Sequence, residues 1–244
     1  MTLAPSDQAI PEQINGLPPI SGFEAEVEHA TADRGPVFLP ESGINLDEVR
    51  AAFAIALHMH QPMVPDADGD LRTDNHNAPV FRDCYQRMGR FIPDLLAEGL
   101  NPRVMLEYSG TLLWGLQQMD DREVIENLRR ITCEPDARRC VEWLGMPWGH
   151  PVAPSTPSKD MHRHIRAWQQ HFAGLFGLDA LQRVKGFSPS EMALPNHPDL
   201  AYEFIKTVRD CGYEWIILQE HTVERVEDAG PSDAPHLPHR FVCR

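Results

Sequence analysis

Short apolar runs alternate with helical segments along most of the chain, and this alternation restricts the fold more than any other feature of the sequence. Residues 51–57 (AAFAIAL) form a continuous apolar run, which is typical of a strand buried on both faces. Strands that alternate with helices at this spacing predict βα units and a parallel sheet, open or closed into a barrel. Further strands are predicted over residues 103–108, 140–148, 183–187 and 213–219, and helices over residues 79–99, 111–132, 158–176 and 198–211.

The two ends of the chain fall outside this alternation. Residues 1–48 are punctuated by proline and hold few apolar clusters, so we expect an extended arm there, with residues 49–244 forming a βα domain. Near the other end, residues 240–243 are strand-like and the chain then stops. About five strands are too few for a parallel barrel, which in its commonest form has eight. The sequence therefore predicts an α/β fold with an incomplete barrel, truncated after about five strands.

Charge and composition argue against several classes of partner. The chain has 22 basic and 36 acidic residues, a net charge of −14, which disfavours binding to nucleic acid or to an anionic membrane. No apolar run approaches the roughly 20 residues that span a bilayer, and no signal peptide is recognisable near the first methionine. The five cysteines are scattered without a CxxC pair. This pattern is typical of reduced thiols in a cytoplasmic protein and argues against a cysteine zinc site.

Polar and aromatic residues follow the ends of consecutive predicted strands, where parallel α/β folds bind ligands. His58 and His60 are two residues apart and would point to the same side of the first strand, which suits either a metal ion or the hydroxyl groups of a sugar. Glu107 ends the second strand, where a carboxylate could bind substrate or cap the next helix. Trp148 and His150 follow the third strand and offer a stacking face and a hydrogen-bond donor.

Further polar residues lie beyond the fourth and fifth strands. Glu191 follows the fourth strand in a segment poor in charge, where a carboxylate can act as nucleophile, general base or metal ligand. Glu220 and His221 follow the fifth strand and are interpreted as an exposed loop pair. Three residues of the helix at 158–176 have helical spacing and are interpreted as a packed stripe: His164, Trp168 and His171.

Three segments, in this order, resemble the motifs of glycoside hydrolase family 57. They are HMHQP at residues 58–62, WGHP at residues 148–151 and GFSPSE at residues 186–191, and the similarity extends over about residues 53–226. That family contains α-amylases, 4-α-glucanotransferases, branching enzymes and amylopullulanases built on an incomplete (β/α)7 barrel. The resemblance implies a retaining enzyme that acts on α-glucans or oligosaccharides and needs no metal or other cofactor.

The resemblance also implies roles for individual residues. The nucleophile would be Glu191, and His58 and His60, with Gln61, would line the subsite for the sugar. Ser188 departs from the family pattern, since many members have tryptophan there, and this leaves the specificity of the subsite open. The family's general acid/base is an aspartate well downstream of the nucleophile. None of the later aspartates of this chain stands in a matching motif: Asp199, Asp210, Asp228 and Asp233. We therefore expect the chain to lack its acid/base residue and to be inactive alone.

Two other functions remain open. A metal-dependent hydrolase of the polysaccharide deacetylase type has a related barrel and would bind zinc through His58, His60 and a third ligand. Gln61 and Pro62, however, supply no acidic base nearby. A catalytically silent glucan-binding or scaffold protein is the second alternative, and the missing acid/base residue favours it.

Overall fold

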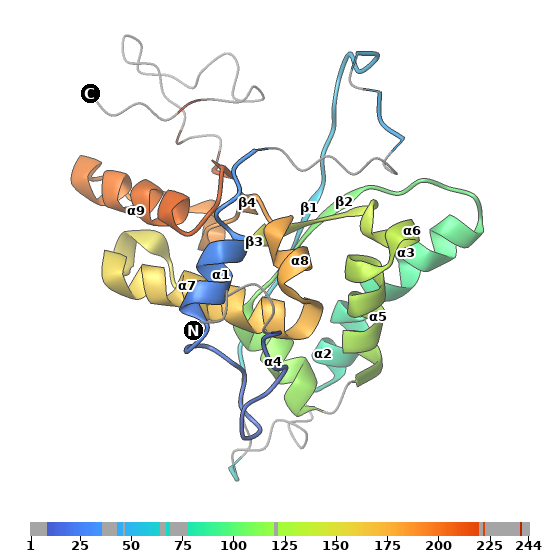
Figure 1. Ribbon diagram of the computed structural model, residues 1–244, viewed down its shortest axis with the longest axis horizontal. Coiled ribbons are helices and arrows are strands. Elements are labelled where there is room, and N and C mark those ends of the chain that lie inside the picture. The colour runs from blue at the N-terminus through green and yellow to red at the C-terminus, as the bar shows by residue number, and fades with distance from the viewer. Residues whose placement is uncertain are drawn as a thin grey trace, which may run out of the picture.

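Five parallel strands form one sheet in the sequential order β1-β2-β3-β4-β5 (Figure 1). The computed structural model describes residues 9–35, 43–45, 47–63, 67–68, 78–119, 122–219, 222 and 240. Within this part of the chain β1 and β5 are the two edges of the sheet. A sequential, all-parallel order that does not close confirms the predicted α/β fold with an incomplete barrel. The strands are β1 (Ala56–Met59), β2 (Val104–Tyr108), β3 (Val141–Gly145), β4 (Gly186–Phe187) and β5 (Trp215–Ile216).

Helices fill the connections between the strands. Two helices occupy residues 79–99, where one was predicted, because the chain turns at Gln86. The long helix over residues 158–176 has the predicted bounds, and Pro157 is its N-cap residue. No helix of the described chain is long and apolar enough to cross a membrane. The helices are α1 (Glu24–Ala30), α2 (Ala78–Tyr85), α3 (Arg87–Ala97), α4 (Gly110–Gln118), α5 (Arg122–Cys133), α6 (Pro135–Arg138), α7 (Ser158–Phe176), α8 (Leu178–Gln182) and α9 (Pro198–Asp210), with 3-10 turns η4 (Ala153–Ser155) and η5 (Ser190–Met192).

The register of the strands gives the sheet two different faces. Leu57 lies opposite Leu106 and His58 lies opposite Glu107, and successive side chains along a strand point to opposite faces. One face therefore carries the leucines and packs against the helices, and the other carries the histidine and the carboxylate. The packed face holds large side chains that are buried in the main core: Leu106, Tyr108, Trp143 and Phe187.

The segment before β1 is exposed, which corrects the prediction of a strand buried on both faces over residues 51–57. Phe53 is 90% exposed and Ile55 is 49% exposed, and the strand itself begins only at Ala56. The apolar run did not predict burial correctly, because β1 is an edge strand. It has a single neighbour, β2, in the described sheet.

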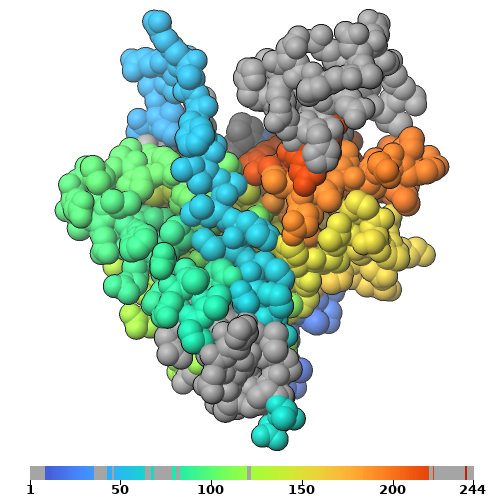
Figure 2. Space-filling model, turned by 180° about the vertical axis from the view of Figure 1, so that it is seen from behind, coloured from blue at the N-terminus to red at the C-terminus, as the bar shows by residue number. Residues whose placement is uncertain are grey.

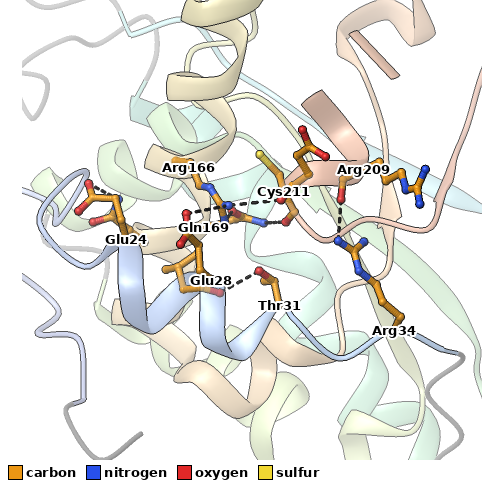
Figure 3. Close-up of polar contacts among 11 residues, drawn as sticks. Glu24, Glu28, Thr31, Arg34, Arg166, Gln169, Arg209 and Cys211 are labelled. Carbon is orange, nitrogen blue, oxygen red and sulfur yellow. Dashed lines mark hydrogen bonds and ion pairs between the residues drawn. The ribbon is translucent and has the colours of Figure 1, made fainter. Parts of the chain in front are cut away.

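The amino-terminal segment is not wholly extended, contrary to expectation. It forms α1, which lies beside α7 and α8 (Figure 1) and buries Val27 completely. Figure 3 shows the polar contacts around it. Arg166 of α7 reaches Glu28 of α1 (3.4 Å), and Arg34 donates to the main-chain oxygen of Arg209 (2.9 Å). Residues far apart in the sequence thus hold this segment against the outer helices.

Candidate active site

Three histidine rings meet at the carboxyl ends of β1 and β3. His58 belongs to β1, His60 follows that strand directly, and His150 lies in the loop after β3. The rings of His60 and His150 are stacked, with centroids 4.1 Å apart and an interplanar angle of 7°. The Nε2 atoms of His58 and His150 are 3.1 Å apart. Residues separated by some 90 positions in the sequence therefore form one contact cluster.

A buried carboxylate completes one side of this cluster. Glu107 is 5% exposed, and its Oε1 is hydrogen-bonded to Nδ1 of His58. Its other oxygen, Oε2, is buried and has no hydrogen-bond partner among the described residues. Burying an acceptor without a partner is costly, so this oxygen is an unsatisfied acceptor beside the histidine cluster.

The charges of the three histidines differ. The hydrogen bond from Glu107 raises the pKa of His58, and the negative charges of Glu107 and Glu191 add to this effect while burial opposes it. Burial, followed by the charges of His150 and His58, lowers the pKa of His60 to about 4. Burial and then the charge of His58 lower the pKa of His150 as well. Of the three rings, His58 is the one whose surroundings favour the protonated form, and its Nε2 lies within hydrogen-bond distance of Nε2 of His150, with the donor set by the tautomers.

Glu191 stands on the same rim in a strained conformation. It lies in η5 with φ 60° and ψ 16°, and its Oε1 is 4.0 Å from Nε2 of His150, which has φ 59° itself. Positive φ values are uncommon for residues other than glycine and concentrate at functional sites. The side chain of Glu191 is 67% exposed, so a ligand bound between it and the histidines could reach the carboxylate.

Two supporting residues were missed by the sequence analysis. The Oγ atom of Ser109 is 2.9 Å from Nδ1 of His60, and it also accepts a hydrogen bond from the amide of Leu112 in the first turn of α4. The hydroxyl of Tyr85, from α2, lies 2.7 Å from the main-chain oxygen of His60 and 3.2 Å from Oε1 of Gln61. A serine between a strand and a helix could have been recognised as an N-cap, but nothing in the sequence pairs it with a particular histidine.

Trp148 packs against helices α4 and α7. A Cβ atom at Gly110 would come within 2.1 Å of its indole ring, and the ring of His171 meets it edge-on with centroids 5.3 Å apart. Its amide donates to the main-chain oxygen of His164 (3.1 Å). Two residues of the stripe predicted on α7, Trp168 and His171, are fully buried as expected, whereas His164 is half-buried and accepts a hydrogen bond from the amide of Gly149 (3.2 Å). The described ring contacts of Trp148 are therefore with helix residues rather than with the histidine cluster.

The remaining candidates lie elsewhere. Asp199 and Asp210 belong to α9, as predicted; the first is almost fully exposed and the second is paired with Lys206. Ser188 is buried, and its amide donates to the main-chain oxygen of Gly145 (2.8 Å). Among the described residues there is no group of three or more His, Cys, Asp or Glu side chains placed to hold a metal ion. Four predicted residues lie outside the described part of the chain: Glu220, His221, Asp228 and Asp233.

The sequence profile of glycosyl hydrolase family 57 matches residues 54–239, which is more than half of the chain. Among solved structures, the chain is similar to 4-alpha-glucanotransferase from Thermococcus litoralis, with 18% identity and a TM-score of 0.42 over 58% of this chain and 19% of that one. The chain thus spans about a fifth of the length of that relative. No curated protein sequence matches it.

Proposed function

The chain belongs to glycosyl hydrolase family 57, and on that premise we propose that it carries the nucleophile side of a retaining active site for α-glucans, with Glu191 as the nucleophile. The observation that carries this proposal is the convergence of His58, His150, Glu107 and Glu191 on the rim formed by the carboxyl ends of the strands. Catalytic residues of barrel enzymes occupy that rim, because the loops after the strands meet there. The reaction proposed is hydrolysis or transfer of a glycosyl unit.

In the first step the carboxylate of Glu191 attacks the anomeric carbon and forms a glycosyl ester. The bond to the leaving oxygen breaks, and that oxygen takes a proton from a general acid. In the second step water or an acceptor hydroxyl gives its proton back to that residue and displaces Glu191, so the anomeric configuration is retained. The two carboxyl groups of a retaining pair are about 5–5.5 Å apart, and both must stand on this rim.

The histidine cluster would hold the sugar. Glu107 Oε2 can accept a hydrogen bond from a hydroxyl, since no described group occupies it. His60 is neutral over the physiological range because burial and the neighbouring rings lower its pKa to about 4, so it can donate or accept through Nε2. His58 and Gln61 would complete the subsite. This mechanism needs no metal ion and no cofactor.

The acid/base aspartate is the part that this chain is proposed to lack. Neither Asp199 nor Asp210 contacts the rim residues in the described structure. General acid catalysis contributes about 10²–10⁴-fold, so we expect negligible turnover of starch by the chain alone. An activated aryl α-glucoside has a leaving group that needs little protonation, and it should still glycosylate Glu191 slowly.

The test is intact-mass spectrometry of the chain after incubation with a 2,4-dinitrophenyl α-glucoside. We expect one hexose added per chain, a stoichiometric burst of dinitrophenolate, and no adduct for Glu191→Gln. Glu142→Gln is the matched control, because Glu142 also lies on a strand of the same sheet but away from the rim, and it should label normally. Labelling of Glu191→Gln would refute the assignment of the nucleophile. Absence of any adduct, together with retention on insoluble starch, would favour the silent glucan-binding protein.

A further inference from the structure

A cavity of about 610 Å3 opens at the amino ends of the strands, away from the rim that carries Glu191. Its lining comes from the segments before β1 and β4, from the starts of β2, β3 and β5, and from α6 and α8. The volume falls within the roughly 300–1,000 Å3 typical of small-molecule sites. The amino end of a barrel ordinarily serves stability and is packed, so the proposed glycosidase chemistry does not account for an open cavity there.

The walls of this cavity are largely apolar and accessible. Phe53 and Ile55 line it from the segment that leads into β1, and Trp215 lines it from β5. All three are exposed, although each is large and hydrophobic. Figures 1 and 2 show the segment before β1, in light blue, standing away from the body of the molecule. Large apolar side chains gathered at one exposed place mark a binding surface.

The charged residues of the lining are mostly cations, in a chain whose net charge is −14. Two of these cations, Lys185 and Arg139, donate hydrogen bonds to uncharged oxygen atoms. Lys185 is 6% exposed, and its ammonium donates to the main-chain oxygen of Asp33 (2.6 Å). Arg139 donates to the side-chain oxygen of Asn101. Neither cation forms an ion pair with a described carboxylate, so their charges are not neutralised within the described chain. The cations of the lining are Arg103, Arg138, Arg139, Arg183 and Lys185.

Two acidic residues of the lining offset only part of this charge, because five cations lie around the same cavity. Glu214 accepts a hydrogen bond from the amide of Gly35. Burial raises the pKa of the Glu142 carboxyl and so favours its neutral form. A ligand with an apolar body and one negative group would match both the walls and the charge of this cavity, whereas a neutral sugar would match neither.

We propose that this cavity binds a small amphipathic anion, whose apolar body lies against Phe53 and Trp215 and whose anionic group meets Arg139 or Lys185. The site is separate from the rim with the histidine cluster and does not depend on the proposed glycosidase function. A carboxylate, a sulfonate and a phosphate monoester share the required chemistry.

The test compares two fluorescent probes that differ by one anionic group. 1-Anilinonaphthalene-8-sulfonate has the apolar body and a sulfonate, and N-phenyl-1-naphthylamine has the same body without it. We expect the sulfonate to bind at one site per chain and more tightly than the neutral probe. Arg139→Glu should weaken sulfonate binding by about tenfold or more, as expected when a contact to a charged group is lost, and should leave the neutral probe unaffected. Laurate and dodecyl phosphate, added as competitors, distinguish a carboxylate ligand from a phosphate.

Arg130→Glu is the matched control, because Arg130 is an exposed arginine of α5 outside the cavity lining. It should bind the sulfonate as the unmodified chain does, while Trp215→Ala should weaken both probes. Equal affinity for the two probes, or equal loss in Arg130→Glu and Arg139→Glu, would overturn the proposal. Probe affinity that falls as the chain dimerises in light scattering would also overturn it, because a second polypeptide would then occupy the cavity. Circular dichroism of each variant separates loss of binding from loss of fold.

Discussion

Replacing Glu107 with glutamine should lower the pKa of His58. In the native chain the Glu107 carboxylate is the first cause of the raised pKa of His58. Glutamine keeps the size and can keep a hydrogen bond to Nδ1, but it carries no charge. The pKa of His58 should therefore fall in the variant. Two changes act on His150 in opposite directions, because the charge of His58 lowers its pKa and the charge of Glu107 raises it, so the shift of His150 should be smaller than that of His58.

The size of this effect follows from the burial of the two partners. Hydrogen bonds to charged groups contribute about 1.5–3 kcal/mol, and this one joins a buried carboxylate to an imidazole that is 44% exposed. Screening by solvent on the His58 side reduces the expected coupling to about 1 kcal/mol. A group with a raised pKa in the folded state adds stability at pH values below its unfolded value, and that stability is lost as the pH rises through the folded value. Glu107→Gln should therefore destabilise the chain more at pH 6 than at pH 9.

The assay is a proton–carbon correlation NMR titration of the histidine rings in the chain alone, which requires no catalytic activity. Glu142→Gln is the control, because Glu142 lies on β3 and does not contact His58. An unchanged titration of His58 in Glu107→Gln would refute the reasoning, as would an equal change in Glu142→Gln. Urea unfolding at pH 6 and pH 9 checks the sign of the stability change independently.

Three further predictions use other parts of the structure. His171→Phe should stabilise the chain by about 1–3 kcal/mol in urea unfolding at pH 7, because both ring nitrogens are buried without a partner among the described residues. It should also flatten the loss of stability below pH 6.5, since burial lowers the pKa of His171 to about 3 and the unfolded chain therefore takes up this proton first. Gly145→Ala should destabilise by about 3 kcal/mol, because the new Cβ would lie 2.1 Å from the hydroxyl of Tyr213; Gly149→Ala, whose nearest contact is 3.3 Å away, should cost less. Elemental analysis should find no stoichiometric zinc, whereas one zinc per chain that is lost in His60→Ala would support a deacetylase-like site.

The fold could be predicted from the sequence where several signals agreed. The helix over residues 158–176 and the helix that ends before Gly212 have amphipathic patterns long enough to place them, and Gly212 adopts the positive φ of 100° that favours glycine after a helix. The parallel order of the strands followed from their alternation with helices. Strand bounds were less predictable, because β4 and β5 pair over two residues only.

The apolar run over residues 51–57 shows why burial could not be predicted. An uninterrupted apolar segment has the same composition in a central strand as in an edge strand, and only the number of neighbours differs. Phe53 is exposed because it precedes an edge strand and lies beside an open cavity. Which strand occupies an edge is a property of the whole sheet, and no local pattern of residues records it.

The sequence predicted which residues lie at the site, but it did not predict the hydrogen bonds between them. The rule that ligands bind at strand ends placed His58, His60, Glu107, His150 and Glu191 on one rim, and the structure brings them together. Which histidine has the raised pKa depends on which ring is hydrogen-bonded to Glu107, and that depends on the register between β1 and β2. Tyr85 and Ser109 were missed because their partners are a main-chain oxygen and a ring nitrogen that spacing cannot identify.

The conformation of Glu191 connects the open edge of the sheet to the proposed chemistry. A left-handed residue other than glycine costs roughly 1–2 kcal/mol, so other contacts must hold it. Gln219 supplies two of them. Its side-chain Nε2 donates to the main-chain oxygen of Glu191 (2.8 Å), and its main-chain amide donates to the main-chain oxygen of Met192 (3.4 Å). Gln219 lies shortly after β5 (Trp215–Ile216), which is one of the two edge strands of the described sheet. The segment that carries Glu191, the proposed nucleophile, is therefore held from beyond an edge strand, and any element that pairs with β5 would also help to fix the position of Glu191.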